Sequence, residues 1–146
     1  MMGGLIDHDG SCHCGAVRVT FRATRPVGEL ALRRCDCSFC RRHNARTVAD
    51  PGGEVVIRAK AGALRHYRFG LRVTDMLLCA ECGVYIAALI LHEGRPLVTL
   101  NANVLEMRDT LDPVPPLVSY AGETAEQRLA RRLAHWTLAR LDVVGA

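Results

Sequence analysis

The sequence has no hydrophobic segment long enough to cross a membrane as a helix. A transmembrane helix needs about 20 apolar residues, whereas the longest apolar run here, Val84–Leu91, has the length of a strand. Residues 1–7 also lack the charged start and the apolar stretch of a signal peptide. These absences predict a cytoplasmic protein with no membrane partner.

Lysine and aromatic residues are scarce as well. Lys60 is the only lysine among 19 basic residues, and the chain has three phenylalanines, three tyrosines and one tryptophan. We therefore expect a core made mainly of Leu, Val, Ala and Ile. The net charge of +4 is too small to indicate nucleic-acid binding by itself. This weak charge gives no reason to expect a nucleic-acid partner. No Gly-x-Gly-x-x-Gly motif follows a predicted strand, so we expect no nucleotide cofactor either.

Short apolar patterns dominate the first hundred residues. Val17–Arg22 alternates apolar and polar side chains, which is typical of a half-buried strand. Similar patterns predict further strands, at residues 30–34, 54–58, 64–69, 74–78, 84–91 and 97–100. The sequence shows no repeat, low-complexity tract or linker, so its length suits a single domain covering 1–146. These patterns predict a mainly β fold, or an α+β fold with the helix at one end.

One helical pattern covers residues 123–141. Thr124 is the expected N-cap, and Gln127 three residues later completes a capping box. An apolar stripe follows at helical spacing, formed by Leu129, Leu133, Trp136 and Leu141. Arginines occupy much of the remaining surface, at Arg128, Arg131, Arg132 and Arg140. We expect this helix to dock with its basic face in solvent; the alternative is a surface for nucleic acid or an acidic partner.

Cysteines are the chemically distinctive residues of this chain. The seven fall into groups of two, three and two, namely Cys12 and Cys14, then Cys35, Cys37 and Cys40, then Cys79 and Cys82. In a reducing compartment such groups indicate metal ligands before disulfides, and an odd number leaves one thiol over in any complete set of disulfides. Seven thiolates on two Zn²⁺ would lower the net charge to about +1.

The two outer pairs suit one closed site. Cys79 and Cys82 form a Cys-x-x-Cys knuckle between two predicted strands, and Cys12 and Cys14 supply two more thiols. Four thiolates are the closed ligand set of a structural zinc. This zinc would clamp the N-terminal loop to a hairpin far away in the sequence.

The middle group is one ligand short of a closed site. Cys35, Cys37 and Cys40 can reach one ion, and no fourth cysteine remains. Three thiolates make zinc a poor generator of hydroxide but leave a soft centre suited to capturing another thiol. Arg41 and Arg42 follow directly and could bind carboxylates of a substrate.

Other interpretations of the middle group are structural or redox. A histidine could close a Cys₃His zinc site, with His43 the nearest candidate among His13, His43, His66 and His92. The three thiols could also form a metal-free redox cluster. Arg41 and Arg42 could be solvated or pair with Asp36 or Asp50.

Taken in order, the three cysteine motifs resemble those of the glutathione-dependent formaldehyde-activating (GFA) enzyme family. The motifs are Gly10-Ser11-Cys12-His13-Cys14-Gly15, Cys35-Asp36-Cys37-Ser38-Phe39-Cys40-Arg41-Arg42 and Cys79-Ala80-Glu81-Cys82-Gly83. The resemblance covers about residues 5–105. It leaves out the C-terminal helix, and Leu78 stands where the family usually has Phe.

This resemblance implies a β-tent of short antiparallel strands around two zinc ions. The outer cysteine pairs would hold a structural zinc and the middle group a catalytic one. The implied activity is that of a carbon–sulfur lyase, which joins glutathione and formaldehyde into S-hydroxymethylglutathione. The alternative is a non-catalytic zinc module that binds a partner protein or small ligand. An enzyme needs an open coordination position on the zinc of the three-cysteine group, in a pocket with basic groups nearby, whereas a module would have that site closed by histidine or buried.

Overall fold

The computed structural model describes residues 4–144 and is mainly β, with 43% strand and 20% helix, as predicted. Its strands are β1 (Ile6–Ser11), β2 (Val17–Ala23), β3 (Arg34–Cys35), β4 (Thr47–Val48), β5 (Glu54–Lys60), β6 (Leu64–Tyr67), β7 (Asp75–Cys79), β8 (Tyr85–His92), β9 (Arg95–Asn101), β10 (Leu117–Val118) and β11 (Thr137–Val144). The helices are α1 (Ser38–His43) and α2 (Ala125–His135), with short 3₁₀ helices η1 (Val27–Glu29), η2 (Ala102–Val104) and η3 (Glu106–Thr110).

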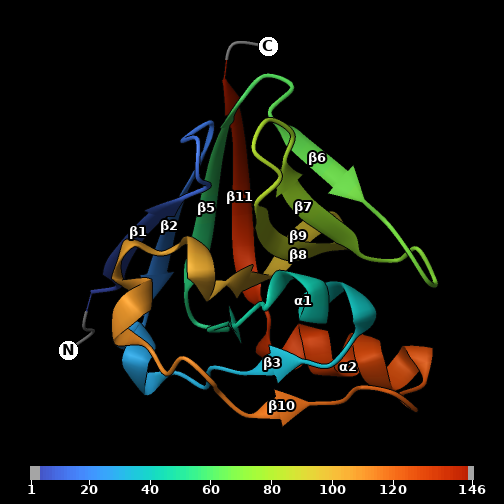
Figure 1. Ribbon diagram of the computed structural model, residues 1–146. Coiled ribbons are helices and arrows are strands. Elements are labelled where there is room, and N and C mark those ends of the chain that lie inside the picture. The colour runs from blue at the N-terminus through green and yellow to red at the C-terminus, as the bar shows by residue number, and fades with distance from the viewer. Residues whose placement is uncertain (1–3, 145–146) are drawn as a thin grey trace.

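The large sheet forms the two sides of a tent. Its order is β1-β2-β5-β11-β9-β8-β7-β6, and β4 pairs separately with β9. In Figure 1, β1, β2 and β5 diverge from β6–β9, with β11 between them and α1, α2, β3 and β10 across the open base. Most strand pairs are antiparallel, but β11 runs parallel to β5 and β10 runs parallel to β3.

Strand β2 shows how alternation produces the core. Val17, Val19, Phe21 and Ala23 are at most 2% exposed, and Val19 lies opposite Ile57 of β5. Burying a Val, Ile or Phe side chain contributes about 1.5–3 kcal/mol. Aliphatic side chains make up most of the buried core, as the scarcity of aromatic residues predicts.

The C-terminal helix is shorter than predicted. The predicted capping box forms. The Thr124 backbone N–H donates to the Gln127 side-chain oxygen, and the Gln127 backbone N–H donates to the Thr124 hydroxyl oxygen. The helix then ends at His135, and the expected continuation to 141 is wrong because Trp136 is already extended. In β11, Thr137 and Ala139 are buried while Leu138 and Arg140 are exposed, so the side chains alternate with the period of a strand.

Two other segments differ from the sequence-based prediction. Residues 30–33 lie outside any strand, although Arg33 forms an isolated antiparallel bridge with Thr47, and the strand itself is reduced to Arg34–Cys35, which pairs with β10. Strand β1 was not predicted, because Ile6–Ser11 carries mainly polar and glycine residues and pairs with β2 at the edge of the sheet. An edge strand with one neighbour needs no continuous apolar face.

Gly10 of β1 is predicted to tolerate no side chain. A Cβ there would lie 2.2 Å from the Val104 carbonyl oxygen and 2.9 Å from Leu105 Cα, and neither backbone atom can rotate away. We expect Gly10→Ala to lower the free energy of unfolding by about 1–3 kcal/mol, measured by urea denaturation of the metal-loaded protein. Gly28→Ala, where a Cβ meets no atom within 4 Å, is the matched control. Equal stability of the two variants would contradict the close approach of β1 to η2.

Candidate functional site

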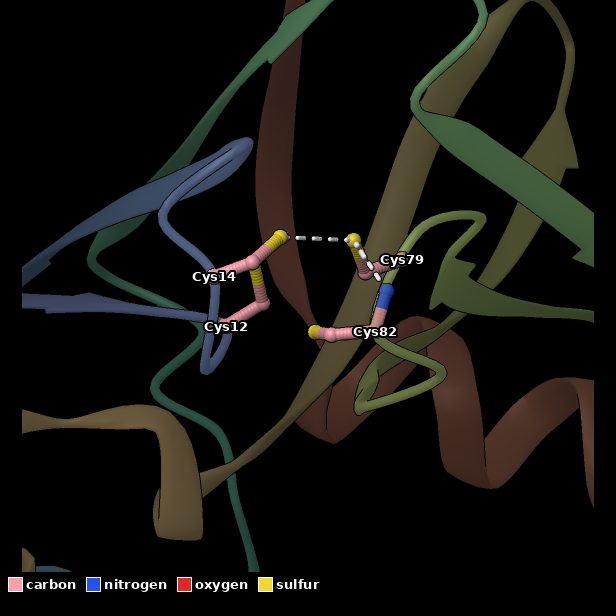
Figure 2. A group of neighbouring side chains, drawn as sticks. All are labelled: Cys12, Cys14, Cys79 and Cys82. Carbon is pink, nitrogen blue, oxygen red and sulfur yellow. Dashed lines mark hydrogen bonds between the residues drawn. The ribbon is translucent and has the colours of Figure 1, made fainter.

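Four cysteine sulfurs meet between the two sides of the tent. Cys12 and Cys14 come from the loop between β1 and β2, and Cys79 and Cys82 flank the turn after β7, as Figure 2 shows. Their sulfur atoms all lie within 4.8 Å of one another. The Cys12–Cys14 and Cys14–Cys79 separations are 3.7 and 3.6 Å. Tetrahedral Zn–S bonds of about 2.3 Å place sulfurs about 3.8 Å apart, so this set fits a four-thiolate zinc.

Backbone amides support these sulfurs. The Val17 N–H donates to Cys12 Sγ at 3.3 Å, and the Cys82 N–H donates to Cys79 Sγ at 3.4 Å. Such donors stabilise negative charge on sulfur and orient it. Gly83 adopts φ +82°, a conformation that glycine reaches without strain, and its N–H donates to the Cys79 carbonyl oxygen at 2.9 Å. The local backbone is therefore shaped as a metal knuckle.

The other three cysteines form a separate cluster at the base of the tent. Cys35 ends β3, Cys37 caps α1 and Cys40 lies within α1, with all three sulfurs within 4.8 Å of one another. The Cys40 N–H donates to Cys37 Sγ at 3.3 Å. Within residues 4–144, no histidine, aspartate or glutamate joins this group. His43 instead lies 4.4 Å from the Phe39 ring, between centroids.

The three thiols share negative charge unequally. Hydrogen bonds from Cys35 and Cys40 lower the pKa of Cys37, whereas hydrogen bonds with Cys35 and Cys37 raise the pKa of Cys40. The pKa of Cys35 is also raised, first through its hydrogen bond to Cys37. One thiolate is therefore held by two thiols, and a soft divalent cation is the group that would allow all three to ionise together.

A cavity of about 600 Å³ opens beside this cluster. Its apolar wall includes Phe69, Met76, Tyr85, Ala88 and Trp136. Its polar lining includes all three cysteines of the cluster together with Asp36, Thr47, Thr74, Thr99, Tyr120 and five arginines, Arg33, Arg72, Arg128, Arg131 and Arg132. The volume lies in the range of small-molecule binding sites.

The arginines that line the cavity are not those suggested by the sequence. Arg41 and Arg42 are exposed on α1 and are absent from the lining of the main cavity. Arg42 donates to the Ser38 carbonyl oxygen at 2.9 Å and borders a smaller hollow of about 300 Å³. Three of the five cavity arginines come from α2, where their spacing of three and four residues places them on one helical face.

Helix α2 therefore faces the opposite way from the expectation. Its basic face was predicted to be solvated, but Arg128, Arg131 and Arg132 turn toward the cavity. The outward side carries Leu129 and Leu133, which are 38% and 43% exposed. The helical spacing holds for Leu129 and Leu133, whereas Trp136 and Leu141 of the predicted apolar stripe lie beyond the end of the helix. The arginine side of α2 is the one that lines the cavity.

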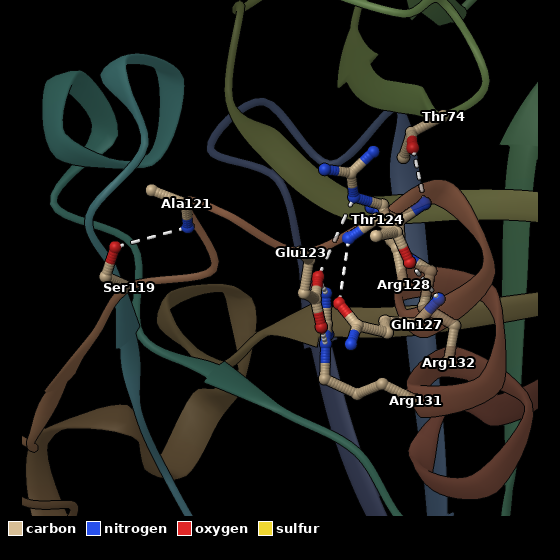
Figure 3. A network of polar contacts seen from close by, with 9 residues as sticks. All are labelled: Thr74, Ser119, Ala121, Glu123, Thr124, Gln127, Arg128, Arg131 and Arg132. Carbon is tan, nitrogen blue, oxygen red and sulfur yellow. Dashed lines mark hydrogen bonds and ion pairs between the residues drawn. The ribbon is translucent and has the colours of Figure 1, made fainter.

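Polar contacts fix the position of each arginine on α2, as Figure 3 shows. Arg131 donates from Nε and Nη2 to the two Glu123 carboxylate oxygens at 2.7 and 3.0 Å, which lowers the pKa of Glu123. Arg132 donates from Nη1 to Thr74 Oγ1 at 2.7 Å and lies 4.6 Å from the Trp136 ring centroid. Burial lowers the pKa of Arg132 to about 10, so it remains charged at neutral pH.

A β-tent with one closed and one open cysteine cluster defines a class of domain built around potential zinc sites. The sequence model of the glutathione-dependent formaldehyde-activating enzyme family matches residues 7–119, and the chain belongs to this family. Its match ends before α2 and β11 begin.

One solved structure agrees with this assignment. The crystal structure of a Rhodobacter sphaeroides protein is 30% identical in sequence, with a TM-score of 0.59. The similarity covers 75% of the present chain and 99% of the other. Within residues 4–144, no helix is both long and apolar enough to span a membrane.

Proposed function

We propose that the chain is a zinc-dependent carbon–sulfur lyase. It captures a thiol such as glutathione at Cys35, Cys37 and Cys40 and joins it to formaldehyde or a similar small aldehyde. The observation that carries this proposal is that three clustered sulfurs line a cavity without a fourth ligand from the described chain. Zinc bound there would supply an open position for a substrate sulfur and lower the pKa of its thiol.

The reaction balances without a redox cofactor. The substrate sulfur adds to the aldehyde carbon, one C–S bond forms, and the carbonyl π bond becomes a C–O single bond. The proton lost by the thiol ends on the new hydroxyl oxygen. Cleavage of the adduct follows the same steps in reverse, so the cavity needs to orient the thiol and the aldehyde rather than to supply electrons.

The chain's own residues support thiol binding in two ways. The apolar wall with Met76, Tyr85 and Trp136 limits water around the sulfur cluster. The arginines add positive charge that suits an anionic thiol substrate.

All seven cysteines of the structure are free of disulfides, which suits a reducing compartment such as the cytoplasm.

We propose a second, structural zinc at Cys12, Cys14, Cys79 and Cys82, giving two ions per chain. Metal analysis tests this division. We expect two zinc ions in the wild type and one in Cys37→Ser, with the far-UV circular dichroism unchanged, because the open cluster is assembled within residues 35–40. Two retained ions in the variant, or one in the wild type, would show that the four-plus-three division is wrong.

Thiol capture is tested on cobalt-substituted protein. Glutathione is expected to change the thiolate-to-cobalt absorption in the wild type and not in Cys37→Ser, which keeps only the closed cluster. An unchanged wild-type spectrum at saturating thiol would instead favour a non-catalytic zinc module.

A further inference from the structure

Two buried donors in the cavity have nothing to bind. Among residues 4–144, only three buried side-chain nitrogen or oxygen atoms lack a hydrogen-bond partner, and two of them are Tyr85 Oη and Arg132 Nε. Both residues line the cavity beside the three-cysteine cluster. A buried donor without a partner costs stability, so each such group calls for an explanation. A ligand that fills the cavity would satisfy both.

Tyr85 is held rigidly in this position. It begins β8, is 1% exposed, and packs edge-on against Phe39 with 4.9 Å between ring centroids. A tilted contact with the His43 ring at 5.6 Å supports the same side chain. The hydroxyl is thus fixed by ring packing and by no hydrogen bond of its own.

Arg132 offers the free edge of its guanidinium group. Its Nη1 is bound to Thr74, and its Nε has no partner. The neighbouring Arg131 uses the equivalent Nε and Nη2 edge to hold the Glu123 carboxylate with two hydrogen bonds. Arg132 forms no ion pair within the described part of the chain. The edge that holds a carboxylate in Arg131 is therefore unoccupied in Arg132.

We propose that Tyr85 and Arg132 form a subsite for a carboxylate of the thiol substrate, beside Cys35, Cys37 and Cys40. A carboxylate has two acceptor oxygens in one plane, which match the side-on edge of a guanidinium, and it can accept a third hydrogen bond from a phenol. This inference rests on the proposed function in one respect, namely that the carboxylate belongs to a thiol substrate.

The two residues of the subsite come from different parts of the chain. It lies on α2, outside residues 7–119 that match the family. Tyr85 comes from within the matched residues. Helix α2 therefore contributes the guanidinium group of the subsite, while the matched part contributes Tyr85 and the sulfurs.

The test compares 3-mercaptopropionate with its methyl ester on the zinc-loaded full chain, by isothermal titration calorimetry. The two probes share a thiol and differ in the carboxylate. We expect the acid to bind at least tenfold more tightly than the ester, and the preference to disappear in Arg132→Gln. Arg140→Gln is the matched control, since it removes one positive charge from an exposed residue outside the cavity. An equal loss in both variants would overturn the subsite in favour of general charge attraction.

Tyr85→Phe provides a second, independent arm. Since its hydroxyl has no partner, we expect the variant to unfold at the same temperature as the wild type or higher, yet to lose several-fold of the preference for the acid. A lower melting temperature with the preference intact would show a structural role only and overturn the proposal for Tyr85.

A third probe separates this inference from the proposed function. 3-(Methylthio)propionate carries the carboxylate but no thiol. Binding that depends on Arg132, together with a cobalt spectrum that no thiol changes, would support the subsite and remove the proposed function. Thiols that change the spectrum without any preference for the acid would overturn the subsite and leave the proposed function standing.

Discussion

Replacing Cys79 by serine is expected to unfold the tent. Cys79 is 2% exposed at the end of β7, and serine is nearly isosteric with it, so little packing is lost. The loss comes from the metal, because structural zinc contributes an apparent free energy of about 10–16 kcal/mol in zinc-finger peptides, which is comparable with the whole stability of a typical domain. We expect a protein without cooperative thermal unfolding, with dispersed amide resonances lost and at most one zinc retained.

The reason for so large an effect is the distance along the chain that the four-cysteine cluster spans. Cys14 and Cys79 are 65 residues apart in sequence, yet their sulfurs lie 3.6 Å apart between the two sides of the sheet. Cys37→Ser is the matched control, because it removes a ligand from a cluster built within one short segment. If Cys79→Ser unfolded cooperatively at the wild-type temperature, the four cysteines would not form the clamp that we propose.

The spacing of the cysteines contained most of the information about the two clusters. Grouping the thiols as two pairs and a triple anticipated which sulfurs meet, because a Cys-x-x-Cys knuckle and a Cys-x-Cys pair each bring two sulfurs to one side of a short segment. The partner that each pair finds depends on the fold, and the sheet provides it by placing the loop before β2 against the turn after β7. The metals themselves stay a prediction.

The orientation of α2 could not be obtained in the same way. Periodicity shows that Leu129 and Leu133 share one face and Arg128, Arg131 and Arg132 another, but it does not show which face docks. The usual rule favours the apolar face. Here the arginine face docks because Glu123, Tyr120 and Thr74 provide partners for the guanidinium groups. Thr74 is 58 residues from Arg132 in the sequence, so that contact exists only in the folded chain.

Tyr85 and β11 were missed for a related reason. Tyr85 stands in a strand pattern like any core residue, and only the folded structure shows that its hydroxyl lacks a partner beside the cysteines. Strand β11 follows α2 without a loop, and its pairing with β5 joins segments that are distant in the sequence. The sequence Thr137–Leu141 shows no clear alternation of polar and apolar residues, because in the structure the polar Thr137 is buried and the apolar Leu138 is exposed, and its apolar residues also fitted the end of a helix.

Removing β11 is expected to prevent folding altogether. A chain that ends at His135 keeps every cysteine, the capping box and all arginines of the cavity. It loses a central strand that pairs with β5 from Leu138 to Val144 and with β9 at Thr137 and Leu138. It also loses Trp136, which is 7% exposed. Truncating a buried Trp or Phe side chain typically lowers the free energy of unfolding by about 3–5 kcal/mol. We expect insoluble protein, or soluble protein without the wild-type circular dichroism.

A shorter truncation is the matched control. A chain that ends at Asp142 loses Val143 and Val144, which are 50% and 60% exposed, and keeps the buried Thr137, whose hydroxyl oxygen accepts from the Asp50 N–H at 2.7 Å. We expect this control to fold and to bind zinc like the wild type. A folded, zinc-binding chain that ends at His135 would mean that the two sides of the tent are held by the cysteine clamp alone. An unfolded one would mean that the residues beyond the family match complete the sheet, so that a single domain covering 1–146 follows from β11 as much as from the metal.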